Sequence, residues 1–411
     1  MKAFFYFVCM VFILWISFFS QPVHDHYNLH LKVLSALLFL ILLIHKRSIK
    51  FLFSKGEIFL WLFLGWQIFS VLFAYDKQIA WQRCVNFTIP FIALYFVFKE
   101  GLDYGKAKFI LFALFFSGIA VSGIGILEFI FNKNLIYEHF IENIFYARYI
   151  KESRIMSTLA SPVIAGTYLM ACIPVSYYVI GELNEKNKRL LAVLGMLIII
   201  AGLILTFTRA SWTSALIVTI LYILRKNTKL FPVLIISCVL IFVSIVMIVK
   251  ARPVLANSVR YRNVINYLIE GHRLNRYGIT FKMIKAHPIA GVGLNNYRIV
   301  FDDYYGRKDE QYEFKIPDNM YLMIIGESGI VGLGLFVMFV FLIMKKAVRD
   351  LKSENGRLRK LRLVFILMLL GLLIHMLSYE LFYWATPYFL FLFSIAGLSW
   401  MERYEKFPKC A

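Results

Sequence analysis

Apolar blocks of about 20 residues recur along almost the whole chain, and they limit the folds that it can adopt. A helix of that length crosses the hydrocarbon core of a bilayer, which is about 30 Å thick. Only helices and closed barrels satisfy the backbone polar groups in lipid, and the alternating strands of a barrel are absent from the sequence. Hydrophobic residues make up 60% of the chain and charged residues 17%, whereas average soluble proteins have about 25% charged residues. We therefore predict an all-α polytopic membrane protein.

About twelve membrane spans can be drawn from the hydropathy, and they divide the chain into three parts. The predicted spans are 3–20, 29–44, 57–74, 84–98, 109–131, 162–181, 189–206, 210–224, 231–249, 317–344, 363–380 and 385–401. Residues 1–249 then hold the first nine helices, 250–316 form one long polar loop, and 317–411 hold the last three helices with a tail.

Basic residues predict which side of the membrane each connector faces, because short cytoplasmic loops carry an excess of Lys and Arg. The connectors assigned to the inside, together with both ends of the chain, hold 25 of the 45 Lys and Arg residues, and the short outside connectors hold eight. Both termini are therefore predicted to be cytoplasmic, with the long loop outside. The net charge of +21 follows largely from this bias, so we expect no nucleic-acid partner.

The long loop carries 12 Lys and Arg against six Asp and Glu, an excess that membrane orientation does not require. Such an excess predicts an anionic ligand, and attraction to anionic lipid head groups is the alternative. The five cysteines show no CxxC or other metal spacing, and no carboxylate cluster suits a metal ion. We therefore expect no metal and no cofactor.

Ionisable residues at membrane depth are costly unless they are paired or face water, so each is a candidate functional group. Arg209 lies between two spans with almost no loop. It could snorkel to the outer interface, or it could offer its planar donor fork to a phosphate of the outer leaflet. Arg154, in the preceding outside connector, is a further candidate for substrate binding. Three more residues fall toward the outer ends of their spans and predict a water-filled cavity that opens outward: Glu128, His375 and Glu380.

A helix is predicted over 272–286, because Arg273, Arg276, Tyr277 and Thr280 then share one helical face. The helix should end at His287, since a residue that precedes proline avoids the helical region. The two arginines could form a solvated stripe or bind a substrate. His287 could act as a base, because imidazole titrates near neutrality, or it could simply end the helix with a backbone hydrogen bond.

Asp318 and Asn319 lie where the chain re-enters the membrane after the long loop. Either could cap the tenth span, since Asp and Asn favour helix N-termini, and a carboxylate there could also deprotonate a sugar hydroxyl. Glu327 follows nine residues later, so it should face away from Asp318 and bond to a neighbouring helix. Gly291 and Gly293 make a flexible turn that could bring backbone close to a ligand.

Three motifs, in this order, resemble the O-antigen ligase/polymerase superfamily of bacterial envelope glycosyltransferases. The topology of about twelve spans with one large loop between the ninth and tenth is similar too. The motifs are Thr206-Phe207-Thr208-Arg209, then Arg273-Leu274…Tyr277 closing in His287-Pro288-Ile289-Ala290-Gly291-Val292-Gly293, then Asp318-Asn319-x-x-Leu322…Gly329-x-x-Gly332.

The resemblance implies a GT-C-like fold in the bacterial inner membrane, with the long loop in the periplasm. It implies transfer of a glycan from an undecaprenyl-diphosphate-linked donor to a hydroxyl of a glycan or lipid A-core acceptor, by a ligase or a polymerase. Arg209 and Arg273 would hold the donor diphosphate, and Asp318 would be the base. The substrate-binding residues expected beside them are Arg276, Tyr277, His287, Asn319 and Arg154.

One departure from the family concerns Asp318, because ligases that attach O-antigen to lipid A-core carry histidine at that position. Aspartate fits related members that polymerise repeat units or glycosylate other acceptors. The alternative function is a transporter or flippase for an anionic lipid-linked glycan, with the same arginines along the substrate path. Transporters more often show two related halves with broken helices near the midplane, whereas the polar residues here gather toward one face.

Overall fold

The computed structural model describes Leu40 and residues 54–134, 154–159, 161–226, 272–306, 315–351 and 356–406. Among these residues the regular structure is helical, as predicted. Three predicted spans (3–20, 29–44 and 231–249) lie outside the described residues apart from Leu40, as do residues 250–271 of the long loop.

Outside the long loop, each described helix except the short α4 and η5 overlaps one of the predicted spans. The helical elements of the described residues are α3 (Lys55–Phe69), η2 (Ser70–Phe73), α4 (Lys77–Arg83), η3 (Cys84–Thr88), α5 (Ile89–Gly101), α6 (Tyr104–Phe131), α8 (Pro162–Glu182), α9 (Lys186–Leu205), α10 (Arg209–Lys226), α15 (His272–Ala286), α16 (Tyr297–Tyr305), α17 (Met320–Asp350), α18 (Gly356–His375), η5 (Leu381–Tyr383) and α19 (Ala385–Lys406).

Six helical segments of the described chain are long and apolar enough to cross a membrane. They are Lys55–Phe73, Lys77–Gly101, Tyr104–Phe131, Pro162–Glu182, Lys186–Leu205 and Met320–Asp350. The protein is therefore a helical, multi-pass membrane protein, and the total of twelve spans stays a prediction.

Two predicted boundaries differ from the structure. The span expected at 84–98 is longer, because α4, η3 and α5 continue one another from Lys77 to Gly101. The span expected at 363–380 lies earlier in the chain, because α18 runs from Gly356 to His375 and the chain continues as a connector over 376–384 that contains η5. Glu380 therefore lies in this connector and not in a helix.

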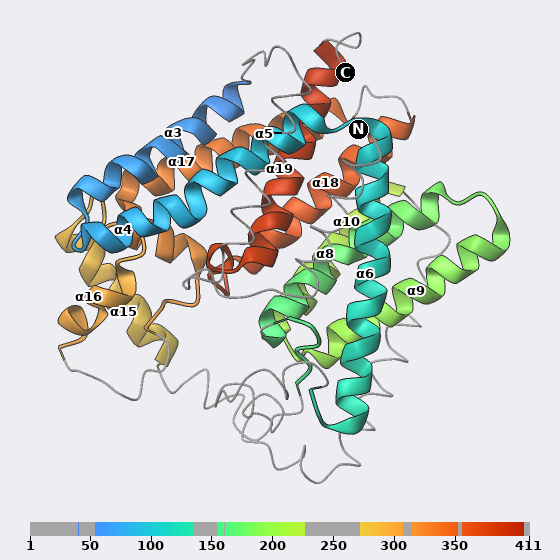
Figure 1. The fold of residues 1–411 in the computed structure, drawn as a ribbon, viewed down its shortest axis with the longest axis horizontal. Helices are drawn as coiled ribbons and strands as arrows, with labels where there is room; N and C mark the ends of the chain where they lie inside the picture. The colour runs from blue at the N-terminus through green and yellow to red at the C-terminus, as the bar shows by residue number, and fades with distance from the viewer. Residues whose placement is uncertain are drawn as a thin grey trace.

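Two groups of helices flank a central pair (Figure 1). On one side α3 packs along α17, with α15 and α16 beside the start of α17. On the other side α6, α8, α9 and α10 pack together. The central helices α18 and α19 contact each other and α8, and α19 also contacts α5. Helix α18 also contacts α10 of one group and α17 of the other, so it meets both groups.

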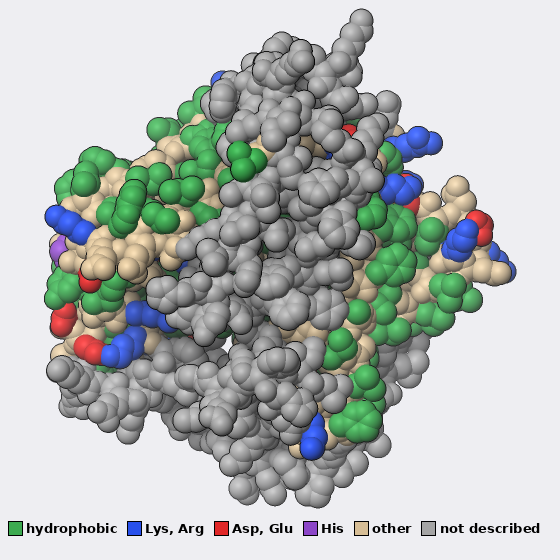
Figure 2. All heavy atoms as spheres, in the orientation of Figure 1, with side chains coloured by type: hydrophobic (Ala, Val, Ile, Leu, Met, Phe, Trp, Pro, Cys, Tyr) green, Lys and Arg blue, Asp and Glu red, His purple; other side chains and the backbone are tan. Residues whose placement is uncertain are grey.

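Large apolar side chains remain exposed on the outer faces of the helices, as expected where a surface meets lipid tails. Figure 2 shows hydrophobic side chains gathered over α3 and α6 on the visible face. Exposed large apolar side chains on these helices are Leu62 and Phe69 on α3 and Phe116 and Leu127 on α6, and α9 has Leu190 exposed as well.

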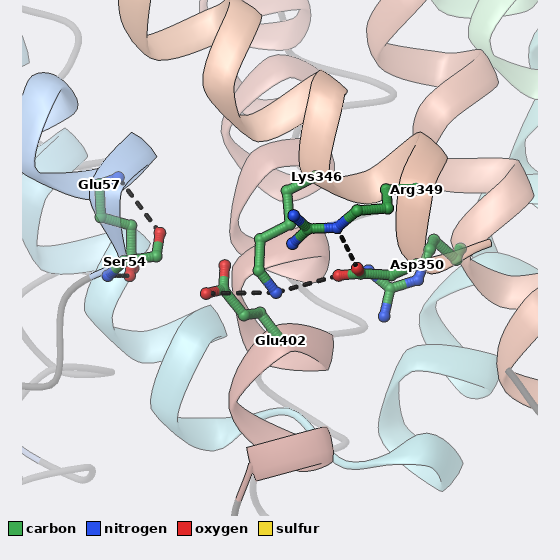
Figure 3. Close-up of polar contacts among 7 residues, drawn as sticks. Ser54, Glu57, Lys346, Arg349, Asp350 and Glu402 are labelled. Carbon is green, nitrogen blue, oxygen red and sulfur yellow. Dashed lines mark hydrogen bonds and ion pairs between the residues drawn. The ribbon is translucent and has the colours of Figure 1, made fainter. Parts of the chain in front are cut away.

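Charged side chains form a network where α3 begins and where α17 and α19 end. Glu57 of α3 accepts a bond from Lys99 at 2.6 Å, and both side chains are only 3% exposed. Nearby, Lys346 of α17 lies between Asp350 at 2.9 Å and Glu402 at 3.3 Å (Figure 3). These helix ends belong to connectors that the charge bias predicts to be cytoplasmic, so the network joins the predicted inner ends of four helices.

Candidate functional site

An ion pair joins the loop helix α15 to the start of α17. Arg276 Nη2 lies 2.6 Å from Asp318 Oδ2, and the two side chains are 9% and 18% exposed. Arg276 also donates through Nη1 to the Ile316 carbonyl at 3.0 Å. Asp318 has a positive φ of 49°, which short polar residues tolerate better than most. Arg276 thus holds the Asp318 carboxylate in one orientation.

The predicted face of α15 packs inward. Thr280 Oγ1 donates to the Arg276 carbonyl at 2.9 Å and is 2.6 Å from the Tyr297 hydroxyl of α16. Burial raises the pKa of the Tyr297 phenol above its ordinary value, so this hydroxyl stays protonated. The predicted helix 272–286 is confirmed by α15, and a solvated stripe is the wrong interpretation for Arg276, which is buried and paired.

Asn319 caps α17, and Asp318 does not. Asn319 Oδ1 accepts from the backbone N–H groups of Tyr321 at 2.9 Å and Leu322 at 3.1 Å. Its Nδ2 donates to the Leu377 carbonyl in the connector after α18, at 3.1 Å. The capping alternative is therefore correct for Asn319 and wrong for Asp318, whose carboxylate is available for other contacts, among them the pair with Arg276.

The connector 376–384 brings a second carboxylate toward Asp318. Glu380 is buried, and within the described residues its Oε2 atom has no hydrogen-bond partner. Burial and the nearby Asp318 carboxylate raise the pKa of Glu380 to about 8, while Arg298 and Arg276 act in the opposite direction. Two carboxylates and two guanidinium groups thus gather near the start of α17. The sequence indicated Glu380 only by its depth.

Residues 288–293 fill a break in α17. Gly329 has φ 66° and ψ −172° inside the helix, and the loop supplies the missing hydrogen bonds. Val292 N–H donates to the Gly326 carbonyl at 2.9 Å, and Ile330 N–H donates to the Pro288 carbonyl at 2.9 Å. The glycine-rich turn therefore packs directly against the backbone of α17, and these hydrogen bonds explain why the two segments lie so close together.

We expect Gly329→Ala to destabilise the protein. A Cβ atom at this position would lie 1.9 Å from the Ile289 carbonyl oxygen, and the backbone region is one that essentially only glycine adopts, at a cost of about 1–3 kcal/mol for other residues. Gly334→Ala is the matched control on the same helix, because its Cβ meets nothing within 4 Å. The melting temperature of the detergent-solubilised protein should fall for Gly329→Ala alone; equal melting temperatures for the two variants would contradict this account of the break.

Glu327 bonds away from Asp318, as its helical position predicts. Its carboxylate accepts a short hydrogen bond from the Tyr383 hydroxyl of η5, and it also accepts backbone bonds from Asn295 and Tyr297. Tyr383 in turn packs against Arg83, whose guanidinium carbon is 4.4 Å from the centre of the ring. This group joins α17, the turn before α16 and the connector that carries Glu380.

The Arg209 motif forms the other half of the candidate site. Arg209 is the first residue of α10, and its side chain is exposed. The turn before it is held by Arg154, which is buried and donates to the Thr206 carbonyl at 3.1 Å and to Thr208 Oγ1 at 3.3 Å. Phe207 in this turn has a positive φ of 50°. Arg154, predicted to bind substrate, thus positions the turn that presents Arg209.

The end of α18 connects the two halves. His375 Nε2 is 2.9 Å from the Oγ of Ser211, which lies two residues after Arg209 in α10. The next residue, Met376, accepts at its carbonyl from Met320 N–H at 2.8 Å, at the start of α17. The elements that carry Arg209 and Asp318 are therefore tied to neighbouring residues of one segment.

Other predicted site residues lie at varying distances from this centre. His287 is exposed and ends α15 through a bond from its N–H to the Met283 carbonyl at 2.9 Å. Tyr277 is half-buried. The backbone of Arg273 lies in α15, but the Arg273 side chain is outside the described part of the structure. Glu128 accepts bonds from the Met156 and Ser157 N–H groups. Within the described residues, no three His, Cys, Asp or Glu side chains come together as a metal-binding group.

The helices and the site define a class: a multi-pass helical membrane protein with arginines and carboxylates gathered where a loop helix meets the membrane helices. Residues 191–337 match the family model described as Wzy_C, O-antigen ligase, a segment that includes Arg209, Arg273 and Asp318. This match supports the O-antigen ligase/polymerase superfamily that the three motifs predicted. No curated protein matches the chain.

Proposed function

We propose that the protein transfers a glycan from an undecaprenyl-diphosphate-linked donor to a hydroxyl of a glycan or lipid A-core acceptor, as an O-antigen ligase or polymerase. The reaction would take place at the periplasmic face of the inner membrane, with both termini in the cytoplasm. The observation that carries the proposal is the Arg276–Asp318 pair at 2.6 Å, because it holds a carboxylate at the point where the loop meets the membrane helices. The O-antigen ligase domain supports a role in glycan transfer.

In this mechanism the acceptor hydroxyl loses its proton to Asp318, and its oxygen forms a bond to the anomeric carbon of the donor. The bond between that carbon and the diphosphate oxygen breaks, and undecaprenyl diphosphate leaves with the electron pair. Arg276 orients the Asp318 carboxylate, because it donates hydrogen bonds both to one oxygen of that carboxylate and to the carbonyl of Ile316. A general base positioned in this way accelerates a reaction by about 10²–10⁴-fold.

Arginines would stabilise the departing diphosphate. Arg209 is exposed at the start of α10, where the helix N-terminus adds partial positive charge. Arg273 would complete the clamp from α15. Burial and the nearby Asp318 carboxylate raise the pKa of Glu380. This shift favours the neutral form of Glu380, which would repel a diphosphate less than a second carboxylate.

A transporter or flippase for an anionic lipid-linked glycan is the second candidate, because α17 is broken at Gly329 and transporters use broken helices. In this chain, however, loop 288–293 occupies the break and bonds to the freed backbone groups. The break is thus filled by protein, which favours transfer over transport.

The test is glycan transfer by the purified protein in proteoliposomes that contain undecaprenyl-diphosphate oligosaccharide and candidate acceptors. Arg209→Ala should lower kcat/KM by about 10²–10³-fold, because one donor to the developing oxyanion is lost. Arg209→Lys should keep part of the activity, since it retains charge without the planar fork. Arg225→Ala, an exposed arginine at the other end of α10, is the matched control and should transfer normally.

Two results would count against the proposal. If Arg209→Ala transfers glycan as well as the wild type, the diphosphate clamp is wrong. If the wild type transfers glycan to none of the acceptors but moves the labelled lipid across the vesicle membrane, the transporter is correct.

A further inference from the structure

A polar pocket of about 370 Å³ lies far from the candidate site. It is formed where α6 begins, α8 ends and α18 begins. Since α18 has 20 residues, its other end, which meets the Asp318 region, lies about 30 Å away. The pocket is lined by Tyr104, Lys108, Gly181, Glu182, Asn184, Arg357 and Lys360.

A single carboxylate positions two ammonium groups in this pocket. Glu182 accepts from Lys108 Nζ at 3.0 Å through Oε2 and from Lys360 Nζ at 3.0 Å through Oε1. The Glu182 side chain is 9% exposed, whereas each lysine side chain is 38% exposed. Lys360 also donates to the Gly181 carbonyl at 2.9 Å. Glu182 is thus buried beneath two cations that remain accessible from the pocket.

The pocket has an excess of positive charge. Lys108, Lys360 and Arg357 contribute three positive charges, and among the described residues of the lining Glu182 is the one acidic residue. Arg357 is exposed, and no carboxylate pairs with it within the part of the chain that the structure describes. It lies in the first turn of α18, where backbone N–H groups without helical partners add partial positive charge. The Tyr104 hydroxyl donates to Glu182 Oε2 at 3.2 Å and so helps to hold this carboxylate in place.

The shape and the location restrict the ligand. A volume of about 370 Å³ is near the lower limit for ligand sites, which hold about 300–1,000 Å³, so a head group fits better than a glycan chain. The lining comes from three connectors that the charge bias predicts to be cytoplasmic. Basic pockets between membrane helices on that side bind the head groups of anionic lipids.

We propose that this pocket binds a phosphate group, presented by the head group of an anionic phospholipid in the cytoplasmic leaflet. The two lysines and Arg357 donate charge-assisted hydrogen bonds to the phosphate oxygens, while Glu182 keeps the lysines in position. The site is independent of the proposed glycan transfer, and its ligand reaches it from the opposite leaflet.

The experiment measures phosphatidylglycerol binding to the full-length protein in detergent, by native mass spectrometry and by the rise in melting temperature. Phosphatidylcholine and phosphatidylcholine with added inorganic phosphate are the two comparison conditions. The proposal expects phosphatidylglycerol to bind and to stabilise the protein more than either. If inorganic phosphate stabilises the protein as much as phosphatidylglycerol does, the phosphate group in the pocket does not come from a lipid. If phosphatidylcholine alone also has the same effect, the pocket is not a phosphate site and the proposal is overturned.

Variants separate the pocket from general attraction to negative charge. Arg357→Gln should weaken phosphatidylglycerol binding by about tenfold or more, since a charge-assisted hydrogen bond to the phosphate is lost. Arg359→Gln is the matched control, because Arg359 is also exposed in the first turn of α18 but does not line the pocket. Lys108→Gln should weaken binding as well. Equal losses for Arg357→Gln and Arg359→Gln would overturn the proposal, and both are surface changes that leave the fold intact.

Discussion

Asp318→Asn is expected to lower kcat/KM for glycan transfer by about 10²–10⁴-fold, because the amide cannot accept the proton of the acceptor hydroxyl. Asparagine is the informative replacement, since it tolerates the positive φ of 49° at this position. Alanine would add backbone strain to the loss of the carboxylate. The measurement is transfer in proteoliposomes, together with the melting temperature of each variant.

Asp303→Asn is the matched control for this prediction, because Asp303 is an exposed aspartate on the neighbouring helix α16. It should transfer glycan as the wild type does. Asp318→His replaces the aspartate by the histidine that ligases of the family carry. It should keep part of the activity and lose it as the pH falls through about 6.5, when imidazole becomes protonated. Full activity of Asp318→Asn with an unchanged melting temperature would remove Asp318 from the mechanism.

Lys99→Met is expected to lower the free energy of unfolding by about 3–5 kcal/mol, because it leaves the Glu57 carboxylate buried without its cation. The two groups are 2.6 Å apart with side chains 3% exposed, and Glu57 also accepts from the Tyr95 hydroxyl at 2.6 Å. Lys188→Met is the matched control. Its pair with Glu185 is equally short at 2.6 Å, but the side chains are 61% and 67% exposed, so it should cost at most about 1 kcal/mol.

The measurement for this second prediction is the melting temperature in detergent, with the double variant Glu57→Gln, Lys99→Met included. Removing both charges should recover part of the lost stability, since no buried charge then remains unpaired. A loss for Lys99→Met no larger than that for Lys188→Met would show that burial of the pair has little effect on stability.

Local patterns in the sequence predicted the helices well. The helix expected at 272–286 is α15, His272–Ala286, because its periodic face and the proline after His287 both act locally. The sequence offered two candidates for the N-cap residue of α17, Asp318 and Asn319. In the structure Asp318 has a left-handed φ, and Asn319 makes the capping hydrogen bonds. Apolar length also predicted the membrane helices, with errors at their ends.

Contacts between distant segments could not be predicted in the same way. The sequence placed Arg276 on a helical face and Asp318 at the membrane, but their ion pair joins residues that are far apart in the chain. The break at Gly329 lies within an apolar run that looks like a continuous helix, and it depends on bonds from residues 288–293. The place of Glu380 beside Asp318 depends on the early end of α18, which also follows from tertiary contacts.

The loop that fills the break in α17 has a consequence for the order of assembly. The Gly326 and Glu327 carbonyls accept from Val292 and Gly293, which are translated earlier and lie in the segment predicted to cross to the outside. Polar backbone groups without partners are costly in lipid, so α17 is complete only after this segment has docked. We expect residues 288–293 to act as an internal template: until they bond to the break, α17 has no stable final shape.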